Sequence, residues 1–288
     1  MVLSRQARLE VVPLLHTVMV APITSTRRGA SSEIQGGDGG YVAVDPLNTN
    51  TLFAEFTGLS ITRSQDGGAT FTDATSGINN DPGFAFIAPF HMNAGNPRHL
   101  MTGGWYIWRT TNQADSWQRA SAITPGHGSV SAIGVSPANS NRAVVGMSDG
   151  YLLFSHAANS ANQTTRWAFS RPRAGFVSSV HWDPANVDIV YATYATFNTA
   201  AGQFHVYRST DGGRTWTGLD GTGTTAIPDL PVHTFIVDPT NRQRLYVGTD
   251  AGVFTSIDGG ANWYKEVTGY ANVVTEALSL SAVAQYGR

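Results

Sequence analysis

The stretch that decides the fold is Ser209-Thr210-Asp211-Gly212-Gly213-Arg214-Thr215-Trp216, because closely similar strings recur along the chain. One copy lies upstream, Ser64-Gln65-Asp66-Gly67-Gly68-Ala69-Thr70-Phe71, and one lies downstream, Ser256-Ile257-Asp258-Gly259-Gly260-Ala261-Asn262-Trp263. Two weaker copies end at Trp117 and Trp167. The closing aromatic residues are therefore 46, 50, 49 and 47 residues apart. A period of about 48 residues predicts a repeat architecture.

Each string has the composition of a tight hairpin turn between two strands. Its Asp is expected to accept hydrogen bonds from backbone N–H groups a few residues on, and its two glycines supply the positive φ that the turn needs. The aromatic residue that follows begins the next strand and buries its ring between neighbouring sheets. We therefore assign structural roles to Asp66, Asp211 and Asp258.

A second pattern precedes each hairpin turn. An apolar run such as Thr234-Phe235-Ile236-Val237 ends at an Asp-Pro or Ser-Pro turn, and a strand rich in β-branched and aromatic residues follows. Each period therefore holds four strands, which is the content of one blade of a β-propeller. Five such blades cover roughly residues 36–78, 83–120, 128–171, 175–220 and 229–268. The sequence predicts an all-β propeller of four-stranded blades.

The two ends of the chain lie outside these five blades. Residues 1–35 do not match the repeat and form an N-terminal segment that can contribute to a closing blade, whereas residues 36–288 form the propeller. Residues 272–280 have the pattern of another innermost strand. We expect a sixth blade built from both ends, since closure removes an exposed sheet edge. An equally good interpretation is that the chain is a fragment of a larger propeller.

The hairpin string resembles the Asp-box, or BNR repeat, of sialidases, xyloglucan-cleaving endoglucanases, sortilin-type receptors and photosystem II assembly factors. The resemblance covers about residues 36–288 and is closest to bacterial sortilin-like repeat proteins, many of which are named glycosyl hydrolases from the repeat alone. It implies a propeller in which the Asp-box lies on the side away from the ligand. The arginine triad and Arg-Ile-Pro string of sialidases are not recognisable here, and neither is the acid-bearing first-blade signature of the xyloglucan enzymes.

Candidate binding residues lie on the turns after the second and fourth strands of each blade, which share the face opposite the Asp-box turns. Aromatic rings stack on sugar faces and carboxylates accept hydrogen bonds from hydroxyl groups, so both suit a propeller mouth that binds a glycan. The predicted ligand-binding residues are Asp38, Trp105, Tyr106, His127, Asp149, Tyr194 and Asp250. Asp149 and Asp250 also fit simple tight turns, because a glycine follows each of them closely.

Composition and charge limit the partners. The chain has 18 Lys and Arg and 20 Asp and Glu, with a net charge of −2, which gives no electrostatic reason to expect nucleic acid or an anionic membrane. It has no cysteine, and its eight histidines show no metal-binding spacing, so we expect neither metal nor cofactor. No apolar run reaches the length of a membrane span.

Two functions remain open from the sequence, and a third, an assembly factor for a larger complex, cannot be tested with one sequence. The first is a non-catalytic binding module that holds a glycan or a protein segment at the propeller mouth. The alternative is a glycoside hydrolase of the xyloglucanase or sialidase type, which needs two mouth carboxylates about 5–10 Å apart. No catalytic residue can be assigned, which favours binding over catalysis. We expect a monomer in an extracytoplasmic or secreted rather than a cytoplasmic location.

Overall fold

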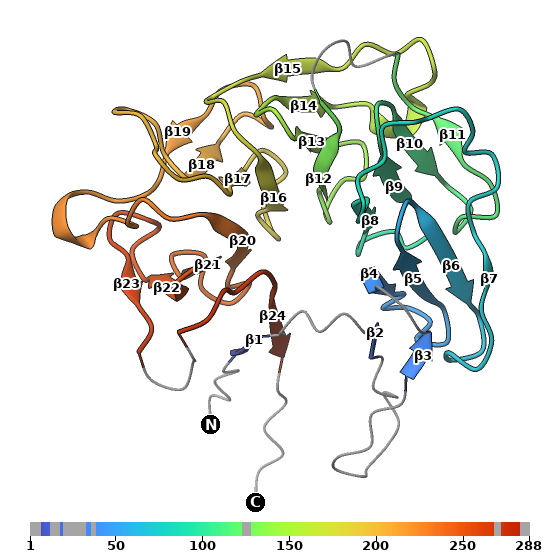
Figure 1. The fold of residues 1–288 in the computed structure, drawn as a ribbon, viewed down its shortest axis with the longest axis horizontal. Helices are drawn as coiled ribbons and strands as arrows, with labels where there is room; N and C mark the ends of the chain where they lie inside the picture. Colours follow the sequence, from blue (N-terminus) through green and yellow to red (C-terminus); the bar gives the residue numbers. More distant parts are fainter. Residues whose placement is uncertain are drawn as a thin grey trace, which may run out of the picture.

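The computed structural model describes residues 7–11, 18–19, 33–35, 39–122, 128–267 and 272–282. These residues form five four-stranded antiparallel sheets, two two-stranded sheets and two short 3₁₀ helices, so the predicted all-β fold is confirmed. The five large sheets follow one another in sequence order along an arc around a common centre (Figure 1). Each of these sheets is one of the predicted blades.

Consecutive strands pair within each blade, from the innermost strand to the outermost. Blade one contains β4 (Gly39–Val44), β5 (Leu52–Phe56), β6 (Ser60–Ser64) and β7 (Thr72–Asp73). Blade two contains β8 (Phe90–Met92), β9 (Leu100–Gly103), β10 (Ile107–Thr110) and β11 (Gln118–Arg119). Blade three contains β12 (Val130–Val135), β13 (Ala143–Met147), β14 (Leu152–Ser155) and β15 (Ala168–Ser170).

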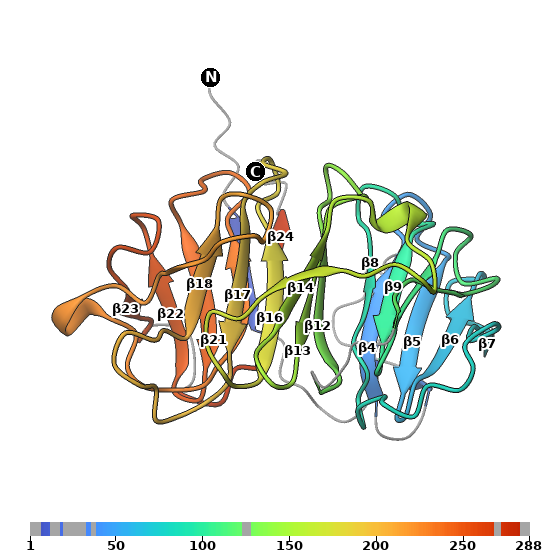
Figure 2. The same cartoon turned by 90° about the horizontal axis from the view of Figure 1, so that it is seen from above.

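The last two blades repeat this order. Blade four contains β16 (Val177–Trp182), β17 (Val190–Tyr194), β18 (Val206–Ser209) and β19 (Thr217–Gly218). Blade five contains β20 (Val232–Val237), β21 (Leu245–Thr249), β22 (Gly252–Ser256) and β23 (Tyr264–Lys265). The turns gather at two rims when the blades are seen from the side (Figure 2). One rim carries the Asp-Pro and Asp-box turns, and the other, here called the mouth rim, carries the turns after the second and fourth strands.

The two ends of the chain pair with each other. Strand β1 (Ala7–Val11) runs antiparallel to β24 (Leu278–Ala282), and β2 (Val18–Met19) pairs with β3 (Glu33–Gln35). These strands lie between blade five and blade one, with β24 beside β20 and β2 beside β4 (Figure 1). Among the described residues, the ends therefore form two short sheets rather than one four-stranded blade. The strand predicted over residues 272–280 begins later, at Leu278.

The hydrophobic core lies between the blades. Four clusters of buried side chains each draw on two neighbouring blades, from blades one and two to blades four and five. Three repeat tryptophans donate their indole N–H to the carbonyl that follows the outermost strand of the preceding blade: Trp117 to Ala74 at 2.7 Å, Trp167 to Ala120 at 2.8 Å and Trp263 to Leu219 at 2.8 Å. Each ring is thus buried without leaving its N–H unpaired, which would cost free energy. These contacts between blades therefore recur at the same spacing as the tryptophans in the sequence.

The Asp of each well-preserved repeat string accepts hydrogen bonds within its own turn. Asp211 Oδ1 accepts from the backbone N–H of Arg214 at 3.0 Å and of Thr215 at 2.9 Å, and Oδ2 accepts from the Thr215 hydroxyl at 2.6 Å. Partial burial raises the pKa of Asp211, but the hydrogen bonds from Thr215 lower it overall to about 2. Asp66 and Asp258 accept the same kind of bonds from Thr70 and Asn262. The hydrogen bonds within each turn therefore use the carboxylate oxygens as acceptors.

The two weaker copies of the string differ from each other. In blade two, Asn112 takes the place of the Asp, and its Oδ1 accepts from the Ser116 N–H at 3.1 Å. In blade three, the connection before Trp167 contains the 3₁₀ helix η1 (Ala158–Ser160) instead of the compact turn. Trp167 still keeps its contact with blade two, so the position of the tryptophan is preserved where the turn is not.

Replacing the carboxylate in one of these turns gives a direct test of its role. We expect Asp211→Ala to cost on the order of 1–3 kcal/mol of unfolding free energy, because four donors, including the Ser209 hydroxyl, lose their acceptor. Asp211→Asn is the matched control, and it is expected to cost much less, since Asn112 in blade two accepts from the Ser116 N–H and donates its Nδ2 to the Ser116 hydroxyl. Urea unfolding of both variants measures the difference. A stable Asp211→Ala variant that had lost ligand binding would overturn the structural assignment.

Candidate functional site

Trp105 lies on the mouth rim with its ring held in an exposed position. Its turn joins β9 to β10 and is fixed by the carboxylate of Asp81, which accepts from the N–H groups of Trp105 at 2.8 Å and Tyr106 at 3.1 Å and from the Trp108 indole at 2.9 Å. The indole of Trp105 lies against Gly83, where an added Cβ would collide with the ring. Even so, 46% of Trp105 remains exposed. The turn therefore presents a large ring to solvent in a fixed orientation.

Tyr106 was predicted together with Trp105, but it serves a different surface. Its ring packs on the core between blades one and two, and the Arg119 guanidinium lies over it at 3.8 Å. Tyr106 lines a polar groove on the outer side of blade two, here called the outer groove, and Trp105 does not. Of this pair, only Trp105 offers its ring at the mouth rim.

Other exposed aromatic side chains accompany Trp105. Their exposed fractions are 41% for Tyr41, 68% for Phe86, 44% for Phe176 and 54% for Phe197. Phe86 and Phe176 lie in connections between blades, and neither was among the predicted binding residues. The repeat pattern does not mark these positions. The available signal is a large ring close to a glycine in a connection, as in Gly175-Phe176.

Tyr194 lies in the core instead of at the mouth. It is fully buried as the last residue of β17, and its hydroxyl donates to the Gly150 carbonyl at 3.0 Å. Burial raises the pKa of this phenol strongly. The Tyr194 hydroxyl therefore holds the Asp149-Gly150 turn in place through the Gly150 carbonyl. Arg171 also holds this turn, because its guanidinium donates to the Asp149 carbonyl at 2.9 Å. Gly150 has a φ of +101°, as a tight turn requires.

Asp250 forms a pair that the sequence pattern did not indicate. Its Oδ1 lies 2.7 Å from Nε2 of His233, which is on the innermost strand β20. The side chains remain 30% and 22% exposed, respectively. Asp250 was predicted as a binding residue, and the structure places it at the mouth rim with His233 beside it. Together they form a partly exposed polar pair at the mouth rim.

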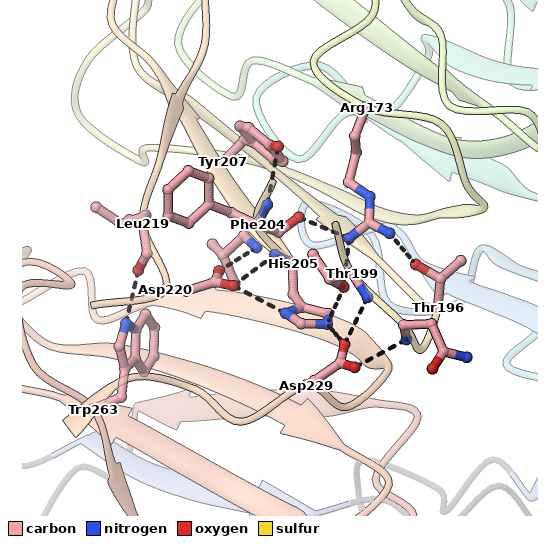
Figure 3. A network of polar contacts seen from close by, with 12 residues as sticks. Arg173, Thr196, Thr199, Phe204, His205, Tyr207, Leu219, Asp220, Asp229 and Trp263 are labelled. Carbon is pink, nitrogen blue, oxygen red and sulfur yellow. Dashed lines mark hydrogen bonds and ion pairs between the residues drawn. The ribbon is translucent and has the colours of Figure 1, made fainter. Parts of the chain in front are cut away.

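A network of polar contacts holds the mouth-rim loop between β17 and β18, residues 195–205 (Figure 3). At its centre is His205, which is 3% exposed. Its Nδ1 lies 2.9 Å from Asp220 Oδ2, and its Nε2 lies 3.1 Å from Asp229 Oδ1. Asp220 also accepts from the backbone N–H groups of His205 and Val206, both at 2.7 Å. The loop is thus tied to the connection between blades four and five.

Arg173 secures the other side of the same loop. It is 5% exposed, and its guanidinium donates to the Thr196 hydroxyl at 2.7 Å and to the Phe204 carbonyl at 3.0 Å (Figure 3). Asp229 accepts from the N–H groups of Asn198 at 2.9 Å and Thr199 at 3.1 Å. The hydrogen bonds from Thr199 are the main reason why the pKa of Asp229 is lowered. The loop carrying Phe197 is therefore fixed at both ends.

Glu55 is a buried carboxyl near the mouth end of the innermost strands. It is 1% exposed and accepts from the N–H groups of Tyr41 at 3.1 Å and Ala88 at 2.8 Å. Burial raises the pKa of Glu55 to about 7, although the two N–H groups act in the opposite direction. A carboxyl with this pKa exchanges a proton near neutrality, as a general acid does.

The innermost strands enclose a central channel. Its cavity of about 460 Å³ lies between β4, β8, β12 and β16. The side chains that line it are mainly apolar, but His91 also lines it. Burial lowers the pKa of His91 to about 4. The pKa of His181 on β16 is also lowered to about 4, mainly by burial and to a smaller extent by the charge of His91. Both imidazoles are therefore neutral at pH 7.

Two predicted binding residues, Asp38 and His127, lie outside the described residues. Within the described part of the chain, no group of three or more His, Asp or Glu side chains is placed to hold a metal ion. The same part of the chain contains no helix that is long and apolar enough to span a membrane.

No family model and no curated protein matches the chain. Solved structures match it in fold. An ancestral GH74 enzyme has a TM-score of 0.63 at 18% identity, over 86% of this chain and 35% of that chain. YCF48 from Cyanidioschyzon merolae has a TM-score of 0.56 at 16% identity, over 78% of this chain and 72% of that chain. This chain is a β-propeller.

A third match, U3-55K, has a TM-score of 0.55 at 12% identity, over 78% of this chain and 63% of that chain. At such identities the similarity establishes the fold of the propeller alone. The chain also spans only 35% of the length of the GH74 enzyme.

Proposed function

We propose that this propeller is a non-catalytic binding module that holds a glycan or a protein segment at its mouth rim. The observation that carries the proposal is the exposed ring of Trp105, fixed by the hydrogen bonds of Asp81 to its turn. An exposed, preorganised ring gives a partner a large contact area at little entropic cost. We also propose that the protein acts as a monomer in an extracytoplasmic or secreted location.

The carboxylates of the mouth rim favour binding over hydrolysis. Asp81 accepts from four residues, Asp229 accepts from two backbone N–H groups, and Asp250 contacts His233. Hydrolysis of a glycoside requires one carboxyl group that is held protonated. The hydrogen bonds to Asp229 lower its pKa, which is the opposite of that requirement. These groups hold loops in place.

Glu55 is the observation that favours the alternative, a glycoside hydrolase. Its raised pKa of about 7 suits a general acid. Its side chain is 1% exposed, however, and both carboxylate oxygens accept backbone hydrogen bonds. A substrate would reach it only after the segments carrying Tyr41 and Ala88 had moved. This barrier makes hydrolysis the second candidate.

A polysaccharide and peptide panel, scored for both binding and release of reducing sugar, tests the proposal. We expect binding without turnover, and Trp105→Ala is expected to weaken binding at least about tenfold, the effect of losing one buried aromatic contact. Tyr264→Ala is the matched control, because Tyr264 is 54% exposed on the outermost strand of blade five.

Two outcomes would contradict the binding module. If Trp105→Ala bound the ligand as tightly as the parent protein, the proposed binding site at the mouth rim would be wrong. Turnover that disappears in Glu55→Gln, Asp149→Asn or Asp250→Asn would establish the hydrolase instead. Glu55→Gln keeps the size of the side chain and removes its proton transfer, so it separates catalysis from binding.

A further inference from the structure

The outer groove of blade two has the properties of a second binding site. Its volume is about 590 Å³, within the range of about 300–1,000 Å³ that ligand sites occupy. One wall is the segment after β7, including Asn79 and Asn80, and a second wall is the segment that includes Asn162 and Gln163. Gln118 of strand β11 also lines the groove.

Hydrogen bonds fix the segments that line the groove. Trp117 donates its backbone N–H to the Ser76 carbonyl at 2.8 Å and its indole N–H to the Ala74 carbonyl at 2.7 Å, which fixes the first wall. Arg109 donates to the Ala161 carbonyl at 2.8 Å, and Asn162 Oδ1 accepts from the Thr164 N–H at 2.9 Å, which fixes the second. A groove with fixed walls loses little conformational entropy when a ligand enters.

Amide side chains dominate the lining of the groove. Five of them contribute: Asn79, Asn80, Gln118, Asn162 and Gln163. An amide offers an acceptor oxygen and two N–H donors, so it matches a hydroxyl group, which both donates and accepts. The side chains of Asn79, Asn80 and Gln163 make no hydrogen bond to any other residue in the described part of the chain. Their donors and acceptors are open to a ligand.

The groove carries little charge for its size. Arg119 is its one ionised lining residue among the described residues, and its Nε already donates to the Ser121 carbonyl at 2.8 Å. Its guanidinium also covers the Tyr106 ring. No carboxylate lines the groove in the described part of the chain. The lining is unsuited to an apolar ligand, which prefers hydrophobic walls, and offers no paired charges to an ionic one.

We propose that the outer groove binds a neutral oligosaccharide, independently of the mouth rim. Hydroxyl groups pair with the open amides of Asn80 and Gln163, which come from the two walls, and the Tyr106 and Arg119 stack forms a flat part of the lining. The site is separate from Trp105, although Tyr106 is the next residue in the chain. The two sites are therefore distinguishable by substitution.

Calorimetric titration with cellohexaose, xylohexaose and maltohexaose tests the groove, with tetragalacturonate as the charged comparison. We expect at least one neutral hexasaccharide to bind more tightly than tetragalacturonate. The double variant Asn80→Gly and Gln163→Ala is expected to weaken that binding about tenfold, as the loss of two neutral hydrogen bonds implies. Glycine suits position 80 because Asn80 has a φ of +52°.

Gln65→Ala is the matched control, since Gln65 is an exposed amide in an Asp-box turn, and it should leave the affinity unchanged. Urea midpoints equal to that of the parent protein show that the variants are folded. Trp105→Ala should also leave groove binding intact, so failure of the mouth proposal and failure of the groove proposal are separate results. Binding lost in Trp105→Ala but kept in the double variant would overturn the groove site, as would the absence of binding by all three neutral hexasaccharides at millimolar concentration.

Discussion

Lowering the pH from 6.5 to 4 is expected to destabilise the propeller through the two channel histidines. The pKa of His91 and that of His181 are about 4 in the folded protein, below the ordinary value of 6.5 that applies in the unfolded chain. As the pH falls through this window, the unfolded chain binds protons that the folded protein excludes. Each histidine therefore contributes up to about 3 kcal/mol of stability at pH 7, which is lost by pH 4.

Glu55 acts in the opposite direction over nearly the same range. Its pKa rises from 4.5 to about 7 on folding, so the folded protein holds a proton that the unfolded chain releases. The stability that this proton contributes is complete below pH 4.5 and is lost as the pH rises through 7. Glu55 thus offsets about half of the expected acid effect, up to about 3 kcal/mol.

Variants separate these contributions. Urea unfolding at a series of pH values should show a smaller acid loss in the double variant His91→Gln and His181→Gln, because glutamine does not titrate. Glu55→Gln should show a larger acid loss than the parent protein, because the opposing carboxyl is removed. If the parent and the double histidine variant followed the same pH profile, the channel histidines would not be the source of acid sensitivity.

Removing the Asp220 carboxylate is expected to produce the largest effect of any single substitution in the loop network. Asp220 is 7% exposed and accepts from two backbone N–H groups and from the His205 ring. In Asp220→Ala these buried donors lose their acceptor, which should cost on the order of 3 kcal/mol. Residues 195–205 should then open more often, because one of their anchors is gone.

Asp229→Ala is the natural comparison, because Asp229 contacts the same imidazole but its side chain is 50% exposed. Water can replace an exposed acceptor, so this variant is expected to cost much less than Asp220→Ala. Urea unfolding compares the two variants, and amide hydrogen exchange at His205 and Val206 reports on local opening. Equal, small losses in both variants would contradict a buried anchor at Asp220.

The repeat strings predicted the blades because their contacts are local. Asp211 bonds to residues three and four positions on, so the eight-residue string contains both partners of each bond. The tryptophan contacts are not local, but they recur at the repeat period and can be counted from the sequence. The all-β fold could therefore be predicted in full, whereas the two short end sheets could not, because they do not repeat.

The residues of the candidate site were harder to predict from the sequence than the fold. Tyr194 was assigned to the mouth because it follows a strand pattern, but the strand extends one residue further and buries the ring. His205 contacts Asp220 and Asp229, which are 15 and 24 residues away on another connection. Neither separation matches the repeat, so the pattern carries no signal for the network. Non-periodic pairs of this kind follow only from the three-dimensional arrangement.

The pairing of β1 with β24 also sets the order in which the molecule can be assembled during synthesis. Strand β1 leaves the ribosome early, whereas its partner Leu278–Ala282 is made after all five blades. Contacts between residues so far apart in the chain form slowly, because a long loop must close first. The blades can pack in sequence as they emerge, but the edge of β1 stays unpaired until β24 has been made. That interval is when the nascent chain is most exposed to misassociation through its strand edges.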